Sequence, residues 1–222
     1  MKKNIFKSII NKRYLDINYL KKIKKSTEIQ KFQKVFILDD FLDKKFFSCF
    51  IKSFRNTNIL KIHKIKWLAN QVLYDYESEY LEEFKKWLYN KNFLAIISFL
   101  LDMKVDFNYK WLNNWFFVSQ DFWYWDRFLD WHNHYWSNRQ SDRVANILFY
   151  LNENYNKING WELGLWYFDS NWNIIEYKRL EPLWNRLVIL VDNEKYYHKV
   201  YTSNLNFIRK SLILEVIKHN EK

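Results

Sequence analysis

The spacing of apolar residues changes from helical to strand-like along the chain. Within the first half, apolar side chains recur about every three to four residues, the period of a helix with one buried face. This pattern predicts one or two helices over residues 1 to 34 and further helices over 42–55, 76–89 and 92–103. A short apolar run at 35–38 predicts a strand between the first two helical regions.

Short strand-like runs dominate the second half and are separated by Asn, Asp and Ser clusters. We expect strands at 115–119, 144–151, 162–168, 174–177, 186–191, 199–202 and 210–216. Helices followed by a meander of short strands are typical of an α+β chain. The pattern therefore predicts a C-terminal sandwich or barrel with the N-terminal helices packed on one sheet.

Length and composition restrict the class of protein. The 222 residues, 49% of them apolar, fit one domain that closes a core. No run of about 20 apolar residues occurs, and charges interrupt the N-terminal apolar pattern. We therefore expect a soluble, cytoplasmic protein without a transmembrane segment. The single Cys49 excludes an internal disulfide framework and a zinc knuckle.

The net charge of +11 is concentrated near the N-terminus. Residues 1–33 are expected to form a basic helical extension, followed by a domain over 34–222. A solvated basic helix is the simplest interpretation, and a membrane-surface or RNA contact is the alternative. Because Lys, Asn and Ile are abundant, as an AT-rich genome produces, the charge alone does not make nucleic acid an expected partner.

Two of the five histidines, His132 and His134, lie two residues apart at the start of the strand-rich half. In an extended strand, residues i and i+2 project from one face, so both imidazoles can converge on one ion. His198 is a candidate third ligand, expected at a strand edge just before residue 199. Histidines partly exposed on the surface are the alternative interpretation.

The surrounding sequence resembles the iron(II)- and 2-oxoglutarate-dependent oxygenases of the prolyl 4-hydroxylase type. The similarity rests on WHNHYWSNRQSDRVANILFYLNENYNKINGWELGLWYF (131–168), EPLWNRLVIL (181–190), YHKV (197–200) and RKSL (209–212). In that family an H-x-D strand, an Arg, a Y-L-N segment, a G-G-x-L hairpin, a P-x-x-x-R-L strand, a distal His and a basic residue before Ser follow in this order. The likeness spans roughly residues 34 to 217.

This resemblance implies a double-stranded β-helix, the jelly-roll or cupin-like fold, that uses Fe(II), 2-oxoglutarate and O2. His132 and His198 match the family's metal ligands, and Arg209 matches the residue that binds the distal carboxylate of 2-oxoglutarate. Ser211 and Tyr150 match positions that help to hold the same carboxylate. The implied reaction is hydroxylation of an unactivated C–H bond on a prolyl or other amino-acid side chain or on a small molecule. The oligomeric state is not indicated.

His134 departs from the family, which has Asp or Glu at that position. Replacing an anionic ligand by neutral imidazole leaves open a non-catalytic binding module, a changed metal preference, or recruitment of the nearby Asp142. A three-His cupin-type dioxygenase that needs no keto acid is a further alternative, although it leaves Arg209 and Ser211 unexplained.

Two further arginines have candidate roles. Arg143 stands where the family has an arginine before the Y-L-N strand. It positions the cosubstrate pocket, pairs with an acidic group of the substrate, or forms a structural salt bridge. Arg186 and Pro182 are interpreted as architectural, at the start of a strand.

Tryptophan stands where the family pattern has glycine or a tight turn. The chain has 12 Trp and 2 Gly, whereas average usage predicts about 15 Gly in this length. Trp125, Trp136, Trp161 and Trp172 fall at such positions, and a bulky side chain at positive φ is unfavourable. The hypothesis that follows is that several of these codons are UGA, read as Trp in this sequence but decoded as glycine by the source organism.

Overall fold

The computed structural model describes most of the chain. The described residues are 9–28, 33–55, 59–65, 69–74, 79–88, 91–107, 117–118, 129–132, 142–201 and 211–219. The helices are α1 (Ile17–Glu28), α2 (Lys44–Arg55), α3 (Glu79–Leu88) and α4 (Lys91–Leu101), with short 3-10 helices at Lys12–Leu15 and Lys157–Asn159. The strands are β1 (Val35–Leu38), β2 (Ile59–Ile65), β3 (Ala69–Tyr74), β4 (Val105–Phe107), β5 (Phe117–Val118), β6 (Leu129–His132), β7 (Arg143–Tyr150), β8 (Leu163–Phe168), β9 (Ile174–Leu180), β10 (Arg186–Val191), β11 (Tyr196–Val200) and β12 (Ser211–Lys218).

A five-stranded antiparallel sheet forms the centre of the molecule, in the order β1-β10-β7-β12-β4. Its middle strand, β7, pairs with β10 on one side and β12 on the other. Leu148 lies opposite Val188 and Ile213, while Ile147 lies opposite Ile189 and Leu214. Because successive residues of a strand point to opposite faces, these two rows define the two faces of the sheet.

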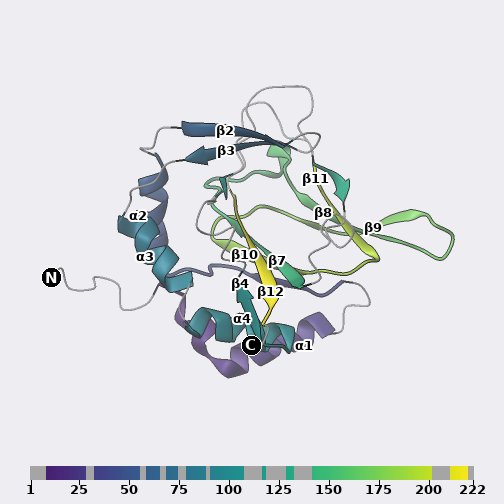
Figure 1. Cartoon of the computed structure of the whole chain (residues 1–222), viewed down its shortest axis with the longest axis horizontal. Helices are drawn as coiled ribbons and strands as arrows, with labels where there is room; N and C mark the ends of the chain where they lie inside the picture. The colour runs from purple at the N-terminus through teal and green to yellow at the C-terminus, as the bar shows by residue number, and fades with distance from the viewer. Residues whose placement is uncertain are drawn as a thin grey trace.

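The helices cover one face of the five-stranded sheet (Figure 1). Phe46, Phe47 and Phe50 of α2 are fully buried there, as are Phe93 and Ile97 of α4. They pack with alternate residues of the sheet, including Ile147, Phe149, Ile189 and Leu214. Amphipathic helices with aromatic stripes bury such stripes against a sheet, since each Phe removes a large apolar area from water.

A four-stranded sheet, β6-β11-β8-β9, lies on the other side of the central sheet. The space between the two sheets holds a second cluster of buried side chains, which we call the inter-sheet cluster. It comprises Val35, Leu148, Tyr150, Trp161, Leu163, Leu165, Leu180, Val188, Leu190 and Val200. Two antiparallel sheets with helices on one of them confirm the predicted α+β jelly roll.

All eight predicted strands are present in the predicted order, but β2, β3, β4 and β6 were not predicted. β2, β3 and β5 form a separate three-stranded sheet, and β4 and β6 are single edge strands. Strands of three or four residues, such as β4 and β6, are too short to show a period. The sequence of β2, ILKIHKI, does not alternate apolar and polar residues, and its register shifts between Ile59 and Lys61.

The N-terminal segment packs into the same core as the rest of the chain. Tyr14 and Leu20 are buried with the helix-side residues of the sheet. The Asn11 amide donates to the Phe41 carbonyl at 2.9 Å, and Ile10 pairs with Leu42. The boundary predicted at residue 33 remains a prediction, but the described part of the segment is not a separate body. Among the described residues, no helix is long and apolar enough to cross a membrane.

Six residues other than glycine have positive φ in the described part of the chain. Four are Asp or Asn, the types that tolerate the left-handed region best: Asp40, Asp102, Asn154 and Asn185. The other two are Trp161, with φ 68°, and Trp172, with φ 62°. Both were predicted from the sequence to occupy glycine positions. Trp125 and Trp136, assigned in the same way, lie outside the described residues.

Trp172 occupies the glycine position of a standard hairpin turn between β8 and β9. The Trp172 amide donates to the Asp169 carbonyl at 3.1 Å, and the Asp169 amide donates to the Asn173 carbonyl at 3.0 Å. These two bonds define a three-residue loop in which a residue in the left-handed region follows a type I turn and forms a G1 bulge. Glycine is favoured there because it has no Cβ, and Trp172 is instead 81% exposed.

We expect Trp172→Gly to stabilise the protein. The left-handed conformation costs a residue with a side chain about 1–2 kcal/mol, and the greater freedom of unfolded glycine offsets part of the gain. The free energy of unfolding in urea should rise by about 1 kcal/mol. The control is Ser170→Gly in the same loop, where φ is not positive. A loss of stability in Trp172→Gly equal to that of the control would contradict this expectation.

Candidate metal and cosubstrate site

Two of the predicted metal ligands lie side by side in the four-stranded sheet. β6 and β11 are antiparallel, and His198 is directly opposite His132 in their register. Residues paired in this way share a face of a sheet, with Cβ atoms about 4.5–5.5 Å apart. The fold therefore brings together two histidines that are distant in the sequence. His134 lies outside the described residues, so its part in the site stays a prediction.

His198 stands in the middle of a strand, not before one. The expected strand at 199–202 is β11, which begins at Tyr196 and ends at Val200, and this corrects the prediction of a loop position for His198. The strand starts early because Tyr196, Tyr197 and His198 each have a partner on β8. Cross-strand pairs of aromatic residues favour an extended backbone, which the turn-like sequence before them does not reveal.

The face occupied by His198 points toward the central sheet. His198 is paired with Leu165, which is fully buried in the inter-sheet cluster, and Val200 of the same strand is buried there too. Tyr197 and Lys199 alternate with these residues and lie on the outer face. The imidazole of His198 therefore belongs to the interior of the jelly roll.

Tyr150 and Ser211 face this interior from the central sheet. They lie opposite each other across β7 and β12, and neither is exposed to solvent. Tyr150 belongs to the inter-sheet cluster. The structure thus places these two predicted cosubstrate residues together on the face of the central sheet that lies toward the four-stranded sheet, which contains His198. Arg209 lies outside the described residues and remains a prediction.

Asn185, which the sequence analysis did not single out, anchors the strand ends beside Tyr150. Its amide donates to the Tyr150 carbonyl at 3.2 Å, and its carbonyl accepts from the Phe41 amide at 2.9 Å. Its side chain exchanges two hydrogen bonds of 2.9 Å with the backbone of Leu42. Asn185 adopts φ 56°, which asparagine tolerates. In the sequence, only its position directly before the R-L strand could have indicated this anchoring role.

Arg143 forms a buried salt bridge, the structural role among those predicted for it. Its side chain is 3% exposed, with Nε 2.6 Å from Oδ2 of Asp192 and Nη1 3.2 Å from Oε1 of Glu215. Burial raises the pKa of Asp192, and the guanidinium of Arg143 opposes that rise. The pair ties β7 to β12 and to the end of β10. Arg186 is likewise structural, since its Nε is 2.5 Å from Oδ1 of Asp39.

No complete set of metal ligands is found within the described ranges of the chain. Within those ranges no three His, Cys, Asp or Glu side chains are close enough to hold a metal ion. Asp142, the carboxylate considered as a substitute for the family's acid, is exposed at the start of β7, and its carbonyl accepts from the Lys218 amide at 2.7 Å. His132 and His198 are of the residue type that binds metal ions, and their backbones are paired in register; their role as ligands stays a prediction.

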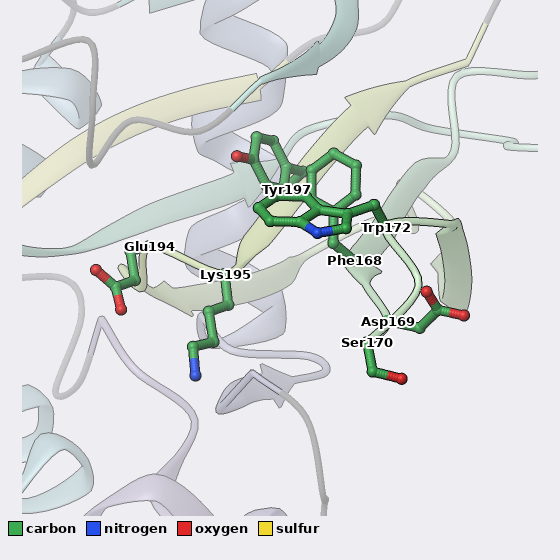
Figure 2. A pocket seen from close by; sticks show the side chains of 7 residues that line it. All are labelled: Phe168, Asp169, Ser170, Trp172, Glu194, Lys195 and Tyr197. Atoms are coloured by element: carbon green, nitrogen blue, oxygen red, sulfur yellow. The ribbon is translucent and has the colours of Figure 1, made fainter.

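A pocket of about 620 Å³ lies on the outer face, at the tip of the β8–β9 hairpin. Figure 2 shows the rings of Phe168, Trp172 and Tyr197 gathered above the polar residues Asp169, Ser170, Glu194 and Lys195. The Phe168 and Tyr197 rings are 5.1 Å apart in an edge-to-face arrangement. Because Tyr197 and His198 point to opposite faces, this pocket is separate from the histidine pair.

The fold is that of the prolyl 4-hydroxylases. No family profile matches the chain, and no curated protein matches it by sequence. Three solved structures are similar: a Pseudomonas putida prolyl-4-hydroxylase, a Trichoplax adhaerens prolyl hydroxylase in complex with a hypoxia-inducible-factor peptide fragment, and prolyl 4-hydroxylases from Phytophthora capsici.

These similarities cover most of this chain at low sequence identity. The P. putida structure has a TM-score of 0.55 at 14% identity and covers 90% of this chain and 100% of its own. The T. adhaerens structure has a TM-score of 0.56 at 12% identity and covers 94% of this chain and 96% of its own. The P. capsici structure has a TM-score of 0.60 at 16% identity and covers 97% of this chain and 69% of its own. The likeness shows the fold, a prolyl 4-hydroxylase-like double-stranded β-helix.

We expect Arg143→Met to destabilise the protein strongly. Removing the guanidinium leaves the carboxylates of Asp192 and Glu215 without their buried partner, and breaking such a pair costs about 3–5 kcal/mol. The matched control is Arg179→Met, which breaks an ion pair with Glu176 in which the arginine side chain is 45% exposed. That control should lose less than about 1 kcal/mol. Urea unfolding of both variants measures the difference, and equal losses would contradict the structural role of Arg143.

Proposed function

We propose that the protein is an Fe(II)- and 2-oxoglutarate-dependent dioxygenase that hydroxylates an unactivated C–H bond. The observation that carries this proposal is the pairing of His132 with His198 on neighbouring strands of a prolyl 4-hydroxylase-like jelly roll. Tyr150 and Ser211 support it, because both are buried on the face of the central sheet that looks toward His198.

Each residue has a distinct task in this proposal. His132, His134 and His198 hold Fe(II) through neutral imidazole nitrogens. Arg209 binds the distal carboxylate of 2-oxoglutarate, and the hydroxyls of Tyr150 and Ser211 donate further hydrogen bonds to it. Bound Fe(II) and 2-oxoglutarate supply the O2 activation that the reaction requires. The apolar inter-sheet cluster excludes water, which strengthens these polar contacts.

A peptidyl substrate is the class that we favour. The similar T. adhaerens enzyme is a prolyl hydroxylase in complex with a peptide fragment. We extend that class to this chain as a prolyl or other amino-acid side chain of a peptide. The described pocket on the outer face takes no part, since it opens away from His198.

The test is anaerobic titration of the protein with Fe(II) and 2-oxoglutarate. The chain used carries W161G and W172G, which place glycine at the two positions where tryptophan has positive φ. We expect a weak metal-to-ligand charge-transfer band. On admission of O2, succinate release should require both Fe(II) and 2-oxoglutarate. His198→Ala should abolish the band, because it removes a metal ligand. The control, His219→Ala, should keep it, because His219 contacts Asp106 at the far end of β12.

Three outcomes separate the proposal from its rivals. Binding of Fe(II) and 2-oxoglutarate without succinate release would identify a non-catalytic binding module. O2 consumption that needs the metal but no keto acid would identify a three-His dioxygenase. A charge-transfer band that survives His198→Ala would place the metal elsewhere and overturn the site.

A further inference from the structure

Trp161 has a backbone conformation that is typical of glycine, and its ring is deeply buried. Its φ is 68°, directly after Gly160 with φ 71°, so two successive residues lie in the region that glycine adopts without steric penalty. Its side chain is only 2% exposed and belongs to the inter-sheet cluster. The backbone is therefore the one that glycine favours, while the indole fills space between the two sheets.

Other tryptophans of the chain show what a suitable position looks like. Trp87 packs between the rings of Phe41, Phe84 and Phe93, with its centroid 4.6 Å from that of Phe93. Trp184 packs against Phe47 at 5.0 Å. Neither has positive φ. Among the described tryptophans, unfavourable backbone geometry is thus confined to the two positions where the family pattern has glycine or a tight turn.

A single codon assignment accounts for both the composition and the geometry. The standard Trp codon is UGG and all standard glycine codons begin with GG, so an AT-rich genome should reduce both residues together. The chain instead has 12 Trp and 2 Gly. UGA codons, which some bacterial codes assign to glycine and others to tryptophan, produce this imbalance when glycine codons are read as Trp.

The location of Trp161 gives this assignment a functional consequence. Residue 161 lies two residues before Leu163, the first residue of β8, and Leu165 of that strand is paired with His198. Tyr150, on the opposite sheet, belongs to the same buried cluster as Trp161. The indole therefore occupies the space between the histidine strand and the proposed cosubstrate residues.

That space cannot hold both an indole and a second molecule. Protein interiors are packed as densely as organic crystals, so few voids exceed one water molecule, whose share of liquid volume is about 30 Å³. A buried tryptophan covers about 150–250 Å² of surface. Removing the indole frees room for a second molecule within the cluster that also contains Tyr150.

We propose that residue 161 is glycine in the natural protein, and that a tryptophan side chain at this position obstructs the space needed by 2-oxoglutarate. The second half rests on the proposed function, whereas the first does not. Position 161 thus decides whether the interior of the jelly roll admits the cosubstrate.

The coding DNA tests the first half directly. We expect UGA at positions 161 and 172, and UGG at positions 87 and 184. UGG at position 161 would overturn the assignment, whatever the other codons are.

Calorimetric titration with 2-oxoglutarate tests the second half, anaerobically and with Fe(II) present. We expect W161G to bind 2-oxoglutarate at least about tenfold more tightly than the parent chain. W161A should recover most of this gain, because it also removes the ring. The matched control is W172G, which changes a tryptophan at positive φ that is exposed at the hairpin tip. It should leave the affinity unchanged.

The contrary outcomes separate this inference from the proposed function. Equal affinity of the parent chain, W161G and W161A would overturn the obstruction and leave the oxygenase proposal standing. A gain in W172G as large as that in W161G would show that general stabilisation, not the space at 161, limits binding. Absence of 2-oxoglutarate binding in all variants would overturn both the obstruction and the proposed function.

Discussion

Burial of strand β7 on both faces is the constraint on which the site depends. Ile147 and Phe149 pack under the helices, whereas Leu148 and Tyr150 face the second sheet. A slip of one residue would exchange the two sets and move the tyrosine hydroxyl into the aromatic helix-side core. Ladders to β10 and β12 fix the register along the strand. Asn185 fixes it at the end, because its amide bonds to the Tyr150 carbonyl.

The two sheets contribute different halves of the proposed site. The smaller sheet supplies His132 and His198 through strand pairing, and the central sheet supplies Tyr150 and Ser211 from the facing side. The polar groups are thus attached to rigid strands, while the apolar cluster between the sheets keeps water away. The salt bridge of Arg143 belongs to the architecture, because it joins β7 to its neighbours through buried charges.

The backbone conformation at the tryptophans indicates which of them occupy positions that favour glycine. Side chains pack wherever the surrounding structure leaves room, but φ reports directly whether a Cβ is tolerated. At 161 and 172 the fold retains glycine geometry around a tryptophan, whereas at 87 and 184 the rings lie within aromatic clusters. On our proposal that residue 161 is glycine in the natural protein, the tryptophan leaves the fold recognisable and fills part of the inter-sheet cluster beside the proposed site.

The sequence by itself determined the main helices, eight of the twelve described strands and, through the family resemblance, the jelly-roll class, because periodicity and motif order are local properties. It predicted the histidines of the candidate site as well. It also identified positions 161 and 172 as unsuited to tryptophan. Only the tertiary structure decided that His198 lies within a strand opposite His132, that Arg143 is held by Asp192 and Glu215, and that the Trp161 indole lies between the sheets. These facts depend on register and on contacts between distant segments, which no local pattern encodes.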